Sequence, residues 1–238
     1  MIRKAVIIAG GMGTRLRPVT YEIPKPLIPI RGRTLTEHVL DILKDAGVVE
    51  VFLSVGYMHE RIRGYFGDGA RFGVRMRYII EDKPLGTGGW MKLIEPFQEH
   101  FIALNGDNLF DLDFREMYRF HLSRGAVATI ALTKVDDPRA YGVVTMEGDR
   151  ITAFLEKSDR PPTDLINSGY YIFSPSVFRY LPPSSAFMLE RDLFPKLAEE
   201  GVLCGFIHDG TWFDTGTFER WEAAIRGWRR KEQEVRDG

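Results

Sequence analysis

The sequence predicts a doubly wound α/β fold built on a mostly parallel, Rossmann-like sheet. In the first half, apolar strand-like segments alternate with helical segments, the order that builds parallel βαβ units. A glycine-rich loop directly follows the first apolar segment, residues 2–9, and so lies where such sheets bind ligands. The second half has short strand signals and a hairpin signal, which favour a smaller mixed sheet in the same chain.

The bulk composition is that of an ordinary globular domain. The 238 residues are 44% hydrophobic and 27% charged, with a net charge of −1 that offers no basic field for nucleic acid. No apolar run approaches the roughly 20 residues of a membrane helix, so we expect a cytoplasmic protein without membrane or nucleic-acid partners. The single cysteine, Cys204, excludes an internal disulfide and is expected to pack in an apolar strand.

The first half, about residues 1–125, is expected to follow a strand–helix rhythm. Residues 2–9 form a near-continuous apolar run, which is typical of a buried parallel strand. A helix should begin after Thr34, a good N-cap residue, and end at Gly47. The remaining elements expected here are a strand at 49–55, a helix at 58–66, a strand at 74–80, a helix at 89–97 and a strand at 101–104.

The second half, about residues 126–217, is expected to carry the smaller mixed sheet within one 238-residue domain. Its predicted elements are strands at 126–134, 142–146, 150–156, 167–173 and 202–208, and a helix at 189–199. A C-terminal helix over 218–236 should present Trp221, Ile225 and Trp228 on one face. We expect that face to pack on the body of the protein rather than to form a subunit interface.

The loop after the first strand has the features of a polyphosphate cradle. It reads GGMGTRLRP from Gly10 to Pro18, and PKPL follows at residues 24–27. Glycines let backbone N–H groups come close to an anion because no Cβ stands in the way. Arg15, Arg17 and Lys25 add positive charge beside those groups. The segment therefore predicts a site for a phosphorylated ligand.

Two familiar phosphate-binding motifs do not fit this loop. A P-loop needs a Gly-Lys dipeptide, and the chain has none. The dinucleotide fingerprint needs a small residue where Leu16 stands, and the next strand ends in Ser54, Val55 and Gly56 with no acid to hold a ribose. Both interpretations are disfavoured.

Two carboxylates are candidate metal ligands. Asp107 follows the buried strand at 101–104, and Asp214 lies in the aromatic segment TWFDTGT, residues 211–217. Each alone could cap a turn or a helix. Together with the cradle upstream, they predict a pair that holds Mg²⁺, a hard cation that prefers oxygen ligands.

The string Gly-Gly-x-Gly-Thr-Arg-Leu-x-Pro, followed by Pro-Lys-Pro, resembles that of the sugar-1-phosphate nucleotidyltransferases, also called nucleotide-sugar pyrophosphorylases. The resemblance covers about residues 5–217, with the motifs in the family's order. It implies that an NTP and a sugar-1-phosphate bind, that Mg²⁺ is the cofactor, and that an NDP-sugar and pyrophosphate form. It also implies that the C-terminal β-helix of longer relatives is absent, because the sequence has no hexapeptide repeats.

The same resemblance assigns the site residues. Arg15 and Lys25 would be catalytic, and Asp107 and Asp214 would hold the metal. The nucleotide-binding positions implied are Ala9, Gly10, Gly11, Gly13, Thr14, Arg15, Glu81, Pro84, Leu85, Gly86, Thr87 and Asp107. The sugar-phosphate-binding positions expected are Asn105, Gly142, Glu156, Lys157, Asn167 and Trp212, and Trp212 could equally pack in the core.

No histidine is needed as a base in such a reaction, because the attacking phosphate oxygen is already ionised. We therefore interpret the five histidines as surface or packing residues: His38, His59, His100, His121 and His208. The chain departs from the family pattern at Leu27, where many relatives have methionine, and at Ser158, where proline is usual. The second departure leaves the path of the loop after Lys157 open.

The substrates are less specified than the reaction. Glu81 could accept hydrogen bonds from the N1–H and 2-amino groups of guanine, which favours GTP with mannose-1-phosphate or a manno-heptose 1-phosphate. The alternative is a thymidylyl- or uridylyltransferase acting on glucose-1-phosphate or an amino sugar 1-phosphate. An alternative of another class is a silent nucleotide-sugar sensor or regulatory subunit. A homodimer or a homotetramer is left open.

Overall fold

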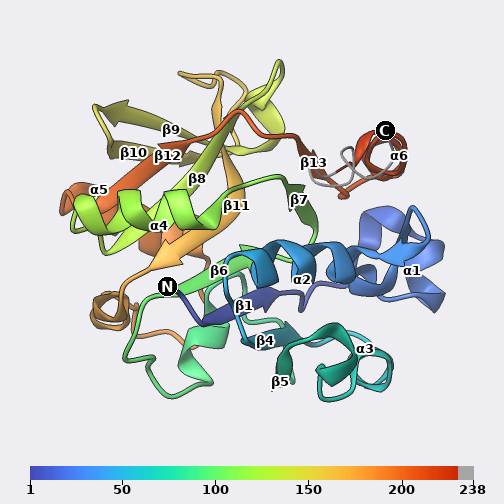
Figure 1. Cartoon of the computed structure of the whole chain (residues 1–238). Coiled ribbons are helices and arrows are strands. Elements are labelled where there is room, and N and C mark those ends of the chain that lie inside the picture. The colour runs from blue at the N-terminus through green and yellow to red at the C-terminus, as the bar shows by residue number, and fades with distance from the viewer. Residues whose placement is uncertain (230–238) are drawn as a thin grey trace.

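A computed structural model describes residues 1–229, and a nine-stranded sheet forms its centre (Figure 1). In spatial order the strands are β5 (Arg75–Ile80), β4 (Glu50–Val55), β1 (Lys4–Ile8), β6 (Phe101–Asn105), β11 (Leu165–Phe173), β8 (Ala128–Lys134), β12 (Leu203–Ile207), β10 (Arg150–Glu156) and β9 (Gly142–Glu147).

The sheet is parallel in its first half and mixed in its second. β5, β4, β1 and β6 are parallel neighbours, which confirms the βαβ rhythm. β11 then pairs antiparallel with both β6 and β8, and β10 pairs antiparallel with β12 and β9. The expectation of a mostly parallel sheet therefore holds only for the first half. The mixed part is not a separate small sheet, because β11 joins it to β6 by a continuous ladder.

Helices cover both faces of the sheet and create two hydrophobic cores. One core contains residues of α2 (Leu35–Asp45), α3 (His59–Phe66), α4 (Phe114–Ser123) and α6 (Phe218–Gly227). The other contains α5 (Phe194–Glu199) and the 3-10 turn Gly89–Lys92. Along β1, Ala5 and Ile7 belong to the first core and Val6 to the second, as the twofold alternation of a strand requires.

The predicted start and end of α2 are confirmed. Thr34 Oγ1 accepts a hydrogen bond from the Glu37 N–H, and the Glu37 carboxylate accepts one from the Thr34 N–H at 2.6 Å. This reciprocal pair satisfies two backbone donors that a helix start leaves free. Gly47 follows the helix with a φ of 90°, a conformation that glycine adopts without strain.

The helix expected over residues 89–97 is wrong. Only the 3-10 turn Gly89–Lys92 forms, and the chain then runs irregularly to β6. Proline disfavours helical conformation in the residue before it, and Pro96 lies within the expected helix. The apolar spacing in this segment instead serves packing, because Trp90 and Met91 are buried in the second core. By contrast, the helical expectation for 189–199 is confirmed, with the π-helical turn Leu189–Leu193 preceding α5.

The C-terminal helix is shorter than expected. α6 ends at Gly227, and Trp228 already has an extended ψ of 114°. A Cβ at Gly227 would lie 2.6 Å from the Phe213 ring, so the chain packs too closely there for a larger residue. Trp228 is buried, and Trp221 and Ile225 pack against the same core, which confirms packing on the body. The rest of the expected helix, residues 230–236, lies outside the described residues.

Several elements were not predicted. They include α1 (Val19–Glu22), α4 and the short strands β2 (Pro29–Ile30), β3 (Arg33–Thr34) and β7 (Asn108–Phe110). β7 pairs antiparallel with β13 (Trp212–Asp214), and the ladder sets Asp214 opposite Asn108. This small sheet brings together two segments about a hundred residues apart in the chain. No helix within residues 1–229 is long and apolar enough to cross a membrane. Cys204 is buried and unbridged, as expected.

The central strands should carry most of the stability. Leu104 on β6 is fully buried, whereas Leu155 on β10 is 44% exposed. We predict that Leu104→Ala lowers the free energy of unfolding by about 2–5 kcal/mol, because it leaves a cavity. Leu155→Ala, the same change at the surface, should alter it by less than about 1 kcal/mol. Urea unfolding followed by circular dichroism measures both, and equal losses would contradict the placement of the core.

Candidate active site

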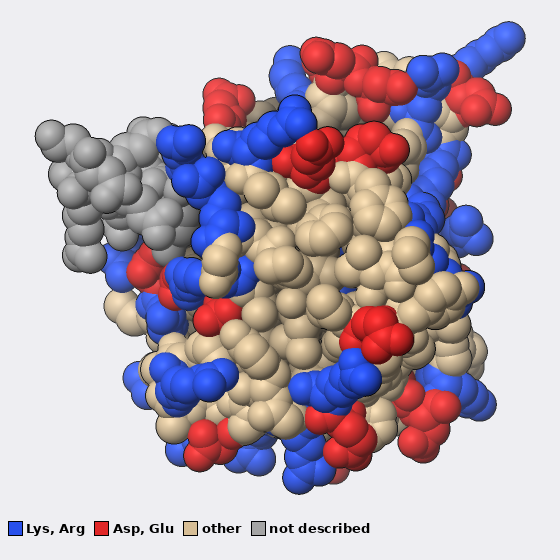
Figure 2. Space-filling view, turned by 90° about the vertical axis from the view of Figure 1, so that its right-hand side faces the viewer, with Lys and Arg blue, Asp and Glu red and all other residues tan. Residues whose placement is uncertain are grey.

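A cleft of about 530 Å³ opens at the carboxyl ends of the parallel strands. Figure 2 views this side of the molecule, where uncharged residues fill the centre and charged side chains surround it. The lining residues are Ile8, Ala9, Gly10, Gly11, Met12, Gly13, Thr14, Arg15, Lys25, Pro26, Glu81, Pro84, Leu85, Gly86, Thr87, Asn105, Gly106, Asp107, Met188 and Gly216. The structure thus brings every predicted nucleotide-binding residue into one cleft.

The glycine-rich loop is shaped by close packing beneath it. Gly13 has a φ of 63°, and its carbonyl accepts a hydrogen bond from Thr20 Oγ1 at 2.9 Å. A Cβ there would lie 2.9 Å from Thr20 Cγ2, which real contacts essentially never show. A Cβ at Gly10 would come equally close to Glu81 Oε1. The absence of a side chain at Gly10 and Gly13 therefore lets the loop pack directly against Glu81 and Thr20. Arg15, which follows this loop, lines the cleft.

Lys25 and Asp107 form an ion pair in the cleft. Lys25 Nζ lies 2.7 Å from Asp107 Oδ2, and the exposed fractions of the two side chains are 14% and 38%. Desolvation works against ionisation of Asp107, but Lys25 and Arg15 outweigh it and hold the pKa of Asp107 below its usual value. Asp107 is therefore a carboxylate at neutral pH, and Lys25 has no other carboxylate partner among the ion pairs of residues 1–229.

Asp214, the last residue of β13, is not among the residues that line the cleft, although Gly216, two residues further on, is. The backbone N–H and the hydroxyl of Thr215 both donate to the Asp107 carbonyl, at 3.0 and 2.9 Å. Asp214 Oδ2 accepts hydrogen bonds from Tyr141 at 2.7 Å and Arg220 at 2.8 Å, and Oδ1 accepts one from the Gly216 N–H at 2.7 Å. Burial and the hydrogen bond to Asp214 raise the pKa of Tyr141, so its hydroxyl keeps its proton and donates to Asp214.

Asp107 and Asp214 provide some, but not all, of the oxygen ligands that a hard cation needs. Asp107 and Asp214 supply oxygen ligands on neighbouring segments, the chemistry that Mg²⁺ prefers. Among residues 1–229, no group of three or more acidic, histidine or cysteine residues could hold an ion alone. Mg²⁺ usually keeps few protein ligands and completes its shell with water and substrate phosphates. The two carboxylates therefore fit an ion that arrives with a nucleotide.

Glu81 directly follows β5 and lines the cleft. Its side chain is held by two protein donors: Ser54 Oγ at 2.6 Å on Oε1, and the Leu85 N–H at 3.2 Å on Oε2. These contacts fix the carboxylate beside Gly10. Each carboxylate oxygen has more than one lone pair, so Glu81 can still accept hydrogen bonds from a ligand.

Of the predicted sugar-side residues, only Asn105 lines the cleft. Its Oδ1 is buried without a hydrogen-bond partner in the described part of the chain. A Cβ at Gly169 would lie 2.9 Å from Asn105 Nδ2, so the irregular stretch of β11 approaches Asn105 closely. Asn167, on that stretch, donates to the Tyr171 hydroxyl at 2.9 Å. Asn105 therefore lies both in the cleft lining and beside the stretch of β11 that carries Asn167.

The hairpin residues lie next to one another but are not part of the cleft lining. Gly142 pairs with Glu156 across β9 and β10, and a Cβ on Gly142 would lie 3.0 Å from the Glu156 carboxylate. Lys157 has a φ of 47° and lies 3.7 Å from that carboxylate. Trp212 donates to the Ser168 carbonyl at 3.0 Å and contacts Tyr141 edge-on. Their assignment to sugar binding stays a prediction.

Some site residues escaped the sequence reasoning. Met188 lines the cleft from a segment that carries no glycine-rich or charged motif. Arg220 holds Asp214, although an arginine two residues into a helix gives no signal of that role. None of the five histidines lines the cleft, and His38 and His121 are buried, as expected of packing residues.

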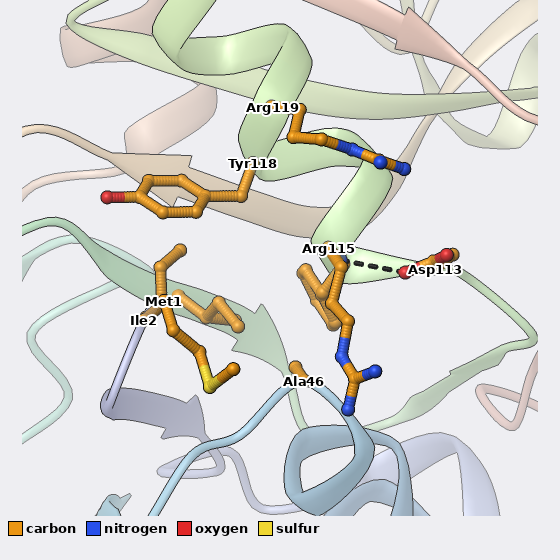
Figure 3. Close-up of a pocket in the computed structure, with 9 residues that line it drawn as sticks. Met1, Ile2, Ala46, Asp113, Arg115, Tyr118 and Arg119 are labelled. Atoms are coloured by element: carbon orange, nitrogen blue, oxygen red, sulfur yellow. Dashed lines mark hydrogen bonds between the residues drawn. The ribbon is translucent and has the colours of Figure 1, made fainter.

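A second pocket, of about 440 Å³, lies near the N-terminus (Figure 3). Met1, Ile2 and Tyr118 contribute to its wall, and it contains none of the predicted site residues. Asp113, which is among its lining residues, is the N-cap of α4, and its side chain accepts a hydrogen bond from the Arg115 N–H. The acidic residue there therefore has a structural explanation.

Comparisons with known proteins agree with this geometry. A family model described as nucleotidyl transferase matches residues 4–229. The mannose-1-phosphate guanylyltransferase of Mycobacterium tuberculosis is 39% identical over 98% of this chain and 70% of its own length. The UTP–glucose-1-phosphate uridylyltransferase of Synechocystis is 38% identical over 94% of this chain and 63% of its own length. The chain thus spans about two thirds of these curated relatives.

A solved structure supports the same relationship. HddC from Yersinia pseudotuberculosis, in complex with GMP-PN, is 32% identical, with a TM-score of 0.80 over 96% of this chain and 100% of that one. The similarity therefore covers the cradle, the parallel strands and the segment around Asp214 together. With a family model that spans nearly all described residues and relatives well above 30% identity, this chain belongs to the nucleotidyl transferase family.

Proposed function

We propose that this enzyme transfers GMP from GTP to mannose-1-phosphate or a manno-heptose 1-phosphate, releasing pyrophosphate. The observation that carries the proposal is the cleft itself, in which a glycine-rich loop, Arg15, Lys25 and Asp107 surround one cavity. Phosphoryl-type transfer needs positioning and charge neutralisation more than acid–base groups. The absence of histidines from the cleft lining among residues 1–229 is compatible with that demand.

The chain's own residues have separate tasks in this proposal. The backbone of the loop at Gly10–Thr14 binds the triphosphate, and Arg15 neutralises charge that grows on the departing pyrophosphate. Lys25 holds the α-phosphate or the incoming sugar phosphate, and Asp107 keeps Lys25 oriented at 2.7 Å when no substrate is bound. The sugar-phosphate oxygen attacks the α-phosphorus in line, and the bond to the pyrophosphate oxygen breaks.

A divalent cation, Mg²⁺, would be held by Asp107 and Asp214 and would supply charge stabilisation for the phosphates when bound. Asp107 is ionised by its cationic neighbours, and Asp214 is oriented by Tyr141 and Arg220. The second half would bind the sugar phosphate through Asn105, Glu156, Lys157 and Asn167. A cytoplasmic location and a homodimeric or homotetrameric state stay predictions.

The choice of GTP is supported by Glu81 and by the relatives. Glu81 presents a fixed carboxylate at the cleft wall, an acceptor for the two N–H donors on the guanine edge. A guanylyltransferase and the complex with GMP-PN are among the similar proteins. A uridylyltransferase of glucose-1-phosphate has nearly the same identity, so UTP or dTTP with glucose-1-phosphate or an amino sugar phosphate is the second candidate.

Pyrophosphate release tests the proposal directly. The purified protein is mixed with each NTP, dTTP included, and with mannose-, glucose-, N-acetylglucosamine- or heptose-1-phosphate, in Mg²⁺ and then in EDTA. We expect one strong combination, in the GTP row, that EDTA abolishes. A strong UTP or dTTP row would support the second candidate. Folded protein that binds nucleotide-sugars without any turnover would instead support a silent sensor.

Removing the charges of the cleft should slow the reaction. We predict that Arg15→Ala and Asp107→Ala each lower kcat by roughly 10²–10³-fold, because groups of this electrostatic type often contribute about 3–4 kcal/mol. Arg75→Ala, at an exposed position of β5, is the matched control and should leave kcat unchanged. Steady-state kinetics with saturating substrates measures kcat. A loss below about tenfold in either cleft variant contradicts the assigned roles.

The variant Glu81→Gln tests whether Glu81 recognises the guanine base. The amide keeps the size of the side chain but replaces one acceptor by a donor, which opposes the guanine N–H groups. We predict that kcat/KM for GTP falls by about 10–100-fold, the range of a paired base contact. Glu60→Gln, a surface control on α3, should have no effect. An unchanged preference for GTP in Glu81→Gln would remove Glu81 from base recognition.

A further inference from the structure

A segment from the second half of the chain lies against the loop that would contact the base. We call residues 81–89 the base-side loop and residues 185–190 the strap. The Phe187 N–H donates to the Leu85 carbonyl at 3.0 Å, and the Gly88 N–H donates to the Phe187 carbonyl at 3.0 Å. The two segments therefore exchange backbone hydrogen bonds as neighbouring strands do, although about a hundred residues separate them in the chain.

The glycines of the base-side loop are explained by this contact. A Cβ at Gly86 would lie 2.4 Å from the Phe187 carbonyl oxygen, and one at Gly88 would lie 2.2 Å from the Phe187 ring. Both distances exclude any larger residue while the strap stays in place. The glycine-rich sequence PLGTGG thus serves the docking of the strap, in addition to any contact with a ligand.

A buried side-chain pair fastens the two segments. Thr87 Oγ1 donates to Glu190 Oε2 and accepts from the Leu189 N–H at 2.9 Å. Glu190 is only 7% exposed. It belongs to the π-helical turn Leu189–Leu193, and π-helical turns are common at functional sites. Burial raises the pKa of Glu190, and the Thr87 hydroxyl opposes that shift by bonding the carboxylate. A buried carboxyl group of this kind is costly without its partner.

Met188 is the residue that the strap adds to the cleft lining, beside Leu85, Gly86 and Thr87. We propose that the strap is part of the nucleotide site, with Met188 in contact with the nucleotide and Glu190 as a positioning residue that acts through Thr87. This inference rests on the proposed function. It has a competitor, because Glu190 also lies within electrostatic reach of Glu156 and Lys157, which we assign to the sugar phosphate.

The test compares Thr87→Val with Thr87→Ser. Valine keeps the shape and loses both hydrogen bonds, whereas serine retains the hydroxyl. We expect Thr87→Val to raise KM for GTP by about tenfold, the equivalent of one or two lost hydrogen bonds. Its kcat and its KM for mannose-1-phosphate should change by less than about threefold. Thr87→Ser should keep most of the nucleotide affinity, and Thr152→Val, an exposed threonine on β10, is the control.

Two further measurements keep the outcomes separate. Titration calorimetry with a GTP analogue whose α–β bridge is a methylene group reports nucleotide binding without turnover. Should Thr87→Val not fold, Met188→Ala replaces it, because this side chain is partly exposed and its loss should weaken the analogue by about threefold to tenfold.

Four outcomes of these experiments distinguish the proposed function from the role of the strap. Wild-type protein that binds the analogue without turnover would overturn the proposed function but not the strap, provided that Thr87→Val weakens binding. If the wild type is active and Thr87→Val and Thr87→Ser both bind the analogue as tightly as the wild type does, the proposed role of the strap is overturned. A rise in KM for mannose-1-phosphate alone would also overturn it, because Glu190 would then serve the sugar side. Wild type that neither binds nor turns over would overturn both.

Discussion

The site depends on the contact between residues 105–110 and residues 211–217. Thr215 donates twice to the Asp107 carbonyl, and the β7–β13 ladder sets Asp214 opposite Asn108. Without this contact the two carboxylates would belong to unrelated segments of the chain. Tyr170, on β11, adds a hydrogen bond from its hydroxyl to the Asn108 carbonyl at 3.0 Å, so the central sheet supports the small one. The candidate metal ligands are therefore fixed by backbone pairing rather than by mobile side chains.

Charge balance within the cleft follows from that placement. Lys25 pairs with Asp107 and Arg220 pairs with Asp214, so each candidate metal ligand has a cationic partner before any substrate arrives. Nucleotide phosphates and a cation would redistribute these partners without creating an unpaired buried charge, which would be costly. Both halves of the molecule line the cleft, because Met188 of the strap and Gly216 come from the second half and the glycine-rich loop comes from the first.

The sequence predicted those features that depend on interactions between neighbouring residues in the chain. The apolar run before Gly10, the capping residue Thr34 and the carboxylates at strand ends are each visible in a few neighbouring residues. Met188 and Arg220 were missed because their roles come from tertiary contacts that leave no trace in spacing. The helix expected at 89–97 failed for a related reason: Gly89 packs against Ser185 of the strap, and Pro96 opposes a helix. The continuous mixed sheet could not be foreseen, since strand order is a non-local property.

The central claim is that Asp107, which lines the nucleotide-binding cleft, and Asp214 act as one metal site. Electron paramagnetic resonance of Mn²⁺ binding, with the methylene analogue of GTP present, tests it most directly. The account predicts that Asp107→Asn and Asp214→Asn each weaken Mn²⁺ binding by about tenfold or more, and that the double variant loses less than the sum of the two, as expected for residues that share one ion. Wild-type Mn²⁺ affinity in folded Asp214→Asn would contradict it.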